Sequence, residues 1–291
     1  MNRLIYLSIA LLLGGCSVFR QTAVDQHVAV SRDLTLQGLS ANSSNNPQEA
    51  ERWFDRAVQS DPKNVEARIL LARTYQGRGK IPSAIQQLEE SLRIDPENVE
   101  VLFRLGECYS ATNQTERALE LSERALRKNR ESVEAWALKA RTLWQMGSRE
   151  QALADYQRAL RIDPQNNELR RQMAVLYQEL DKPLRALTTL DRIAADFDEE
   201  KTPEEILVRQ SASLQELARH REAADRLAVG FQRGDYSEDL AARYVTALLD
   251  AGDSDHAAQA LLTARNRFPN GQRLVQLQTR FSAPVRQNLI R

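Results

Sequence analysis

The chain has 291 residues, and its 40 Lys+Arg balance 40 Asp+Glu, which argues against a nucleic-acid-binding protein with its usual basic excess. Hydrophobic residues make up 42% of the chain, enough to form a core, so a fully disordered protein is excluded. With 11 Gly and 9 Pro, turn-forming residues are too few for a β-sandwich, a barrel or a doubly wound sheet, and the composition predicts helices.

The chain begins with a short apolar run that leads to a cysteine. As a helix, residues 4–13 (LIYLSIALLL) would span about 15 Å, half of a bilayer core of about 30 Å, which is too short for a transmembrane helix and suits a signal peptide. The string Leu13-Gly14-Gly15-Cys16 resembles the bacterial lipobox. The resemblance implies that residues 1–15 are a lipoprotein signal peptide and that Cys16 carries the lipid. The alternative is an ordinary secretory signal in which Cys16 is incidental.

The same resemblance implies a location. A lipidated Cys16 would anchor the protein to a bacterial membrane, facing the periplasm, because two or more acyl chains bind a bilayer stably. In Gram-negative lipoproteins, an Asp after the cysteine signals retention in the inner membrane. Ser17 stands here instead and favours the outer membrane, and we expect residues 16–30 to be a tether.

A period of 34 residues extends through the rest of the chain. Asp-Pro recurs at Asp61-Pro62, Asp95-Pro96 and Asp163-Pro164. Asn129-Arg130 occupies the equivalent position in the repeat that lacks it. Aligning on this period gives units 31–64, 65–98, 99–132, 133–166, 167–200, 204–237 and 238–271, with a three-residue slip at 201–203. A repeat of this length predicts one supersecondary unit per period.

Small and large side chains recur within the units at helical spacing. One column is alanine in every unit, namely Ala50, Ala84, Ala118, Ala152, Ala186, Ala223 and Ala257. Four positions later the side chain is mostly large, as in Phe54 and Tyr156. These spacings place each set on one helical face, and a residue as small as Ala is required where two antiparallel helices approach closely.

These columns resemble the tetratricopeptide repeat (TPR). The resemblance implies an all-α fold, a solenoid of about seven helix-turn-helix repeats that forms a right-handed superhelix over 31–271. Gln37 and Ala41 stand where the repeat pattern expects large apolar side chains. Residues 31–64 would therefore be a degenerate repeat whose first helix matches the pattern weakly. Residues 272–281 would be a helix that caps the open end. Pro284 breaks the pattern, and we expect 282–291 to be a loose tail.

The sequence contains no recognisable catalytic or cofactor-binding pattern. Its three histidines are scattered, and HExxH, GxSxG, GxxxxGK[ST] and GxGxxG strings do not occur. Cys108 lies beside the core residue Tyr109 and is expected to be a buried, inert thiol. We therefore expect a protein that is not an enzyme, with no cofactor, no metal and no small-molecule substrate.

The second residue of six units is acidic: Glu66, Glu100, Glu134, Glu168, Glu205 and Asp239. Such a row could suggest cation binding. The better interpretation is structural, because each residue falls in the first turn of a helix, where a negative charge meets the positive end of the macrodipole.

The TPR resemblance implies an inner groove, and this is the surface where we expect a partner to bind. First-helix residues between the core columns would line it: Arg73, Arg104, Glu107, Arg141, Trp144, Arg171 and Gln172. An Arg-rich groove with one aromatic residue suits protein or peptide partners with acidic segments, since guanidinium groups pair with carboxylates and stack on rings. The alternative is a solvated charged face without a ligand.

A lipobox followed by TPR units and little else resembles the layout of bacterial pilus-assembly lipoproteins. This resemblance implies a lipid-anchored, non-enzymatic scaffold that brings protein partners together at the cell envelope. An accessory TPR subunit of an envelope enzyme or of a polysaccharide-export complex is the alternative.

Overall fold

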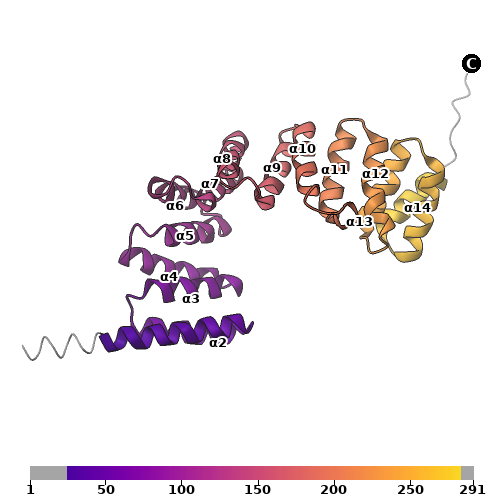
Figure 1. The fold of residues 1–291 in the computed structure, drawn as a ribbon. Helices are drawn as coiled ribbons and strands as arrows, with labels where there is room; N and C mark the ends of the chain where they lie inside the picture. Colours follow the sequence, from indigo (N-terminus) through magenta and orange to yellow (C-terminus); the bar gives the residue numbers. More distant parts are fainter. Residues whose placement is uncertain (1–24, 283–291) are drawn as a thin grey trace, which may run out of the picture. The chain divides into compact units, whose positions relative to one another are not determined.

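The computed structural model describes residues 25–282, and these residues form helices and turns without any β-strand. The all-α class and the helix-turn-helix repeats predicted from the sequence are confirmed, because the helices follow one another as antiparallel pairs (Figure 1). In this part of the chain no helix combines the length and the apolar character that crossing a membrane requires.

The chain divides into two compact units, Met1–Ile162 and Asp163–Arg291. The described part of the first unit contains a helix over 25–43, followed by α2 (Pro47–Ser60), α3 (Val65–Gly77), α4 (Ile81–Ile94), α5 (Val99–Ala111), α6 (Thr115–Lys128), α7 (Val133–Gln145) and α8 (Arg149–Ile162). The second contains α9 (Asn167–Glu179), α10 (Pro183–Ala194), the short 3₁₀ helix η1 (Glu199–Lys201), α11 (Glu204–Glu216), α12 (His220–Gln232), α13 (Glu238–Asp250), α14 (Ser254–Arg267) and α15 (Gln272–Ser282).

A polar side chain fixes where most of the first helices begin. At α5, the Asn98 Oδ1 atom accepts a hydrogen bond from the backbone N–H of Val101 (3.1 Å), and at α7 Ser132 Oγ accepts one from Ala135 (3.1 Å). Such a cap contributes about 1 kcal/mol, because it satisfies a backbone donor that the helix leaves unpaired. The helices α3, α5, α7, α9, α11 and α13 all begin at the first residue of a 34-residue unit in the frame given above.

The turn inside each helix pair needs a left-handed backbone at one fixed position. The φ angle there is positive in every pair: Asn45 (56°), Gly79 (72°), Asn113 (60°), Gly147 (81°), Asp181 (54°), Ala218 (58°) and Gly252 (77°). Gly, Asn and Asp tolerate this conformation, so the composition of the column follows from its geometry. Ala218 is the exception.

The column of alanines lies at the close contact of each pair. All seven alanines are fully buried. Glycine provides a similar close approach in the first helix of one pair, because a Cβ atom added to Gly106 of α5 would lie 2.6 Å from Leu138 Cδ2 of α7. The core is therefore a series of small-residue contacts with large side chains such as Leu138 fitted between them.

The first helix pair differs from the sequence prediction in extent and in packing. Residues 25–30, expected to belong to the tether, are helical, and Ser60 Oγ of α2 donates a hydrogen bond to the backbone oxygen of His27 (3.1 Å). The first helix of this pair was expected to pack poorly because it lacks large apolar side chains. It instead buries small side chains against α2, namely Ser31, Thr35, Gly38 and Ala41. Ser31 Oγ also donates to the backbone oxygen of Ala57 (2.8 Å). The large side chain in this contact is Phe54 of α2, which is buried there.

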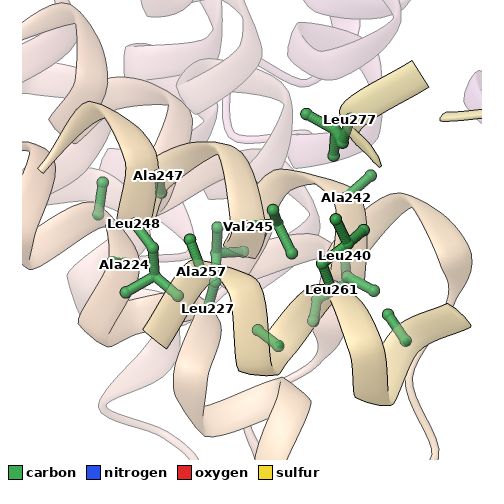
Figure 2. Close-up of a cluster of buried hydrophobic side chains, with 14 of the residues drawn as sticks. Ala224, Leu227, Leu240, Ala242, Val245, Ala247, Leu248, Ala257, Leu261 and Leu277 are labelled. Carbon is green, nitrogen blue, oxygen red and sulfur yellow. The ribbon is translucent and has the colours of Figure 1, made fainter. Parts of the chain in front are cut away.

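At the other end of the chain, α15 covers the last helix pair. Leu274 and Leu277 are buried in the same core cluster as α13 and α14. Figure 2 shows Leu277 next to Ala242 and Leu240 of α13. The helix α15 thus buries apolar surface that would otherwise be exposed at the end of the array, as a capping helix does.

Two polar side chains occupy positions where the repeat pattern expects apolar bulk. Lys139 Nζ lies 3.4 Å from Glu123 Oε1 and 3.8 Å from an oxygen of the buried Asp155. In the second unit, the buried Gln210 donates a hydrogen bond from Nε2 to Asp191 Oδ1 (2.7 Å). These partners compensate the loss of hydration at Lys139 Nζ and at Gln210 Nε2, whereas Gln210 Oε1 is buried without a hydrogen-bond partner among the described residues.

Candidate functional site

The first helices of successive repeats lie side by side, as α5 and α7 do in the first unit and α11 and α13 in the second. In each unit, the exposed surface of these helices is named here the first-helix face of that unit; it comprises α3, α5 and α7 in the first unit, and α9, α11, α13 and α15 in the second. Of the side chains expected in the groove, the structure places Arg73, Arg104, Glu107, Arg141 and Trp144 on helices of the first unit, and Arg171 and Gln172 on α9 of the second unit.

In the first unit, most of the groove arginines are paired with carboxylates of the chain itself. Arg104 Nε lies 2.8 Å from Glu100 Oε1 in the same helix. Arg141 Nη2 of α7 lies 3.4 Å from Glu107 Oε1 of α5, so this pair bridges two repeats. Arg73 is exposed, and no carboxylate of residues 25–282 forms an ion pair with it.

The second unit has a similar pattern of ion pairs on its own first-helix face. Arg171 pairs with Glu168 in α9, and its Nε atom lies 3.8 Å from Glu205 Oε2 in α11. Gln172 donates a hydrogen bond from Nε2 to Glu168 Oε1 (2.7 Å). Farther along, Arg209 Nε pairs with Glu205 (3.0 Å). Charges of both signs therefore alternate over this face.

Part of the acidic row thus pairs with part of the groove arginines, as Glu100 does with Arg104 and Glu168 with Arg171, although the sequence prediction treated the two sets separately. The acids do lie in the first turn of their helices, as predicted. The missed signal was a spacing of four residues between acid and arginine, as in Glu100 and Arg104, which places both on one helical face. The face is closer to neutral than a list of its arginines suggests.

Glutamine side chains join neighbouring first helices and were not predicted to matter. Gln178 of α9 donates hydrogen bonds to Ser213 Oγ (3.0 Å) and to the backbone oxygen of Arg209 (3.1 Å) in α11. In the first unit, Ser110 Oγ donates to Gln145 Oε1 (2.8 Å). These bonds fix the position of one repeat against the next and give the face a defined surface.

Cys108 is buried, as predicted, and its thiol is held in the protonated form. Burial raises its pKa to about 11, although Gln76 Nε2, which donates a hydrogen bond to Sγ (3.1 Å), acts in the opposite direction. Since the thiolate is the reactive form of cysteine, this residue is a poor nucleophile near neutral pH. Among the described side chains, no group of three or more His, Cys, Asp or Glu could hold a metal ion. Cys16 lies outside the described residues.

Comparison with known proteins identifies a protein family and several solved structures with a similar fold. A model of the tetratricopeptide repeat family matches residues 41–90, 76–142 and 143–202. No curated protein matches the chain.

The solved structures that are similar to this chain include three at 16% sequence identity. A tetratricopeptide repeat protein from Parabacteroides merdae has a TM-score of 0.60, and the match covers 86% of this chain and 98% of that one. PilF from Pseudomonas aeruginosa has a TM-score of 0.59, with 74% and 97% covered. PilW, described as a type IV pilus biogenesis factor, has a TM-score of 0.57, with 86% and 98% covered. At this identity the likeness concerns the fold alone.

Proposed function

The chain belongs to the tetratricopeptide-repeat family, and we propose that it is a lipid-anchored, non-enzymatic scaffold that binds protein partners at the bacterial cell envelope. Arrays of this kind typically present extended binding surfaces rather than catalytic sites. The observation that carries the proposal is the first-helix face of each unit, where hydrogen bonds between Ser and Gln side chains join neighbouring repeats and charged side chains lie at the surface.

The partner surface in the first unit centres on Arg104, Arg141 and Trp144. The two guanidinium groups already contact Glu100 and Glu107, but both pairs are partly exposed to water, and ion pairs at a protein surface contribute only about 0–1 kcal/mol each. An acidic partner segment therefore displaces them at little cost. Trp144, a residue type enriched at binding hot spots, would supply apolar contact area beside the charges.

A role in pilus assembly is the proposed process. It is supported by the lipobox-like string that ends at Cys16 and by the fold shared with PilW, which is a type IV pilus biogenesis factor. The alternative, an accessory subunit of an envelope enzyme or of a polysaccharide-export complex, uses the same anchor and the same surface. The identity of the captured proteins separates the two, because the alternative predicts glycan-polymerising enzymes among them.

The anchor is tested by Cys16→Ser. We expect this change to abolish incorporation of a palmitate analogue and to move the protein from the membrane fraction to the soluble fraction, because the apolar run at 4–13 is too short to span a bilayer. Metabolic labelling and fractionation measure both effects, with Cys108→Ser as the control for a thiol that carries no lipid. Undiminished label in Cys16→Ser would refute the anchor.

The partner surface is tested by reversing charge on one face at a time. We expect Arg104→Glu with Arg141→Glu to reduce the yield of partners crosslinked in cells by about tenfold, because like charges would then meet an acidic segment. Arg93→Glu with Arg127→Glu makes the same charge change on the second helices α4 and α6 and serves as the control. Circular dichroism should show equal helicity in both variants. Greater loss from the control than from the groove variant would assign binding to the second helices.

A further inference from the structure

A cavity of about 460 Å³ opens on the first-helix face of the second unit, towards the C-terminal end of that unit. Three helices line it: α11 contributes Gln215, α13 contributes Ala242, Arg243 and Thr246, and α15 contributes Arg273, Gln276 and Leu277. Its volume lies in the range of ligand-binding pockets. None of these residues was singled out by the repeat pattern, because the third wall belongs to a helix outside the repeats.

Two guanidinium groups from different helices share one carboxylate at this cavity. Arg243 Nε lies 2.7 Å from Asp239 Oδ2, and Arg273 of α15 pairs with Asp239 Oδ1. The residues that line the cavity include these two guanidinium groups and no carboxylate, whereas the carboxylates of Asp239 and Glu238 lie beside it. Both arginine side chains stay accessible, with 43% and 60% of their surface exposed. A guanidinium group carries five N–H donors, so each arginine keeps donors beyond those used by Asp239.

The rest of the lining combines uncharged polar groups with a small apolar floor. Gln215 of α11 and Gln276 of α15 contribute amide groups to the lining. Leu277 and Ala242 are largely buried and lie next to each other (Figure 2). The third wall is held in place, because Leu274 is buried in the core and the backbone N–H of Arg273 donates to Glu238 Oε1 (3.1 Å). The cavity is thus part of a packed structure.

We propose that this cavity binds an acidic segment of a partner protein, with one Asp or Glu carboxylate between Arg243 and Arg273 and a neighbouring aliphatic side chain against Leu277 and Ala242. The two guanidinium groups of the lining favour a carboxylate, because they form paired, charge-assisted hydrogen bonds with it. Gln215 and Gln276 supply hydrogen bonds to the backbone of an extended segment. The inference rests on the proposed function as a protein-binding scaffold and adds a second contact region to it.

The test uses the full-length protein in detergent and a random heptapeptide display library as the probe. We expect the wild type to enrich peptides that carry Asp or Glu beside an aliphatic residue. Fluorescence anisotropy then measures the best peptide against its Glu→Gln or Asp→Asn form. Arg243→Gln with Arg273→Gln should weaken binding of the acidic peptide by about tenfold, whereas Arg93→Gln with Arg127→Gln, the matched change on the second helices α4 and α6, should leave it unchanged.

A second variant separates loss of charge from loss of fold. Asp239→Asn removes the carboxylate that competes with the ligand, and we expect binding of the acidic peptide to tighten by about two- to fivefold. A merely destabilised variant would not gain affinity. The proposal is overturned if the library shows no acidic enrichment, or if the double Gln variant binds the acidic peptide as well as the wild type does. Neither result depends on Cys16, so failure of the anchor and failure of this cavity remain distinguishable.

Discussion

Replacing Leu138 by Ala is expected to lower the free energy of unfolding of the first unit by about 2–5 kcal/mol. Leu138 of α7 is fully buried, and its Cδ2 atom fills the space that Gly106 of α5 leaves open by having no Cβ. The glycine and the leucine therefore form one fitted contact between two repeats. Shortening the leucine leaves a cavity that the surrounding helices cannot close without moving a whole repeat.

Tryptophan fluorescence during urea unfolding measures this effect, because the tryptophans at 53, 136 and 144 all lie in the first unit and report on it selectively. Leu36→Ala is the matched control, since Leu36 is also helical, lies in the same unit and is exposed. We expect the control to change stability by less than about 0.5 kcal/mol. Equal losses in the two variants would contradict the packing described here.

Enlarging the alanine column is expected to have the next largest effect. Ala152→Leu should lower the stability of the first unit by about 1–3 kcal/mol, because Ala152 of α8 is fully buried at the close contact of a helix pair and the added carbons force side chains off their preferred rotamers. Ala118→Leu in α6 should behave in the same way.

Ala154→Leu, two residues farther along α8, is the control for helix propensity and size, because Ala154 is exposed. Glu100→Gln is the control for the acidic row, and we expect it to cost only a few tenths of a kcal/mol. Thermal unfolding followed at the tryptophans ranks the four variants. If Ala154→Leu destabilises the unit as much as Ala152→Leu, the column does not mark the helix contact.

The sequence by itself determined the class of fold, the repeat and the small-residue contacts. A 34-residue period carries this information because every repeat meets the same packing problem, so Ala recurs at the close contact and Asn or Ser recurs before the first helix. Asn129 replaces the Asp of the recurring Asp-Pro pair but makes the same turn contact. Its Oδ1 atom accepts a hydrogen bond from the backbone N–H of Glu131 (3.0 Å), as Asp61 Oδ1 does from the backbone N–H of Lys63 (3.0 Å).

Only the tertiary structure decided how the first-helix face is charged and where it is hollow. The pairing of Arg141 with Glu107 depends on the spacing of two side-by-side helices, which no local pattern encodes. The cavity between α11, α13 and α15 combines residues as far apart in sequence as Gln215 and Leu277. Long side chains on exposed helices have many rotamers, and the neighbouring repeat selects among them, so the binding chemistry of this protein is a property of the assembled array.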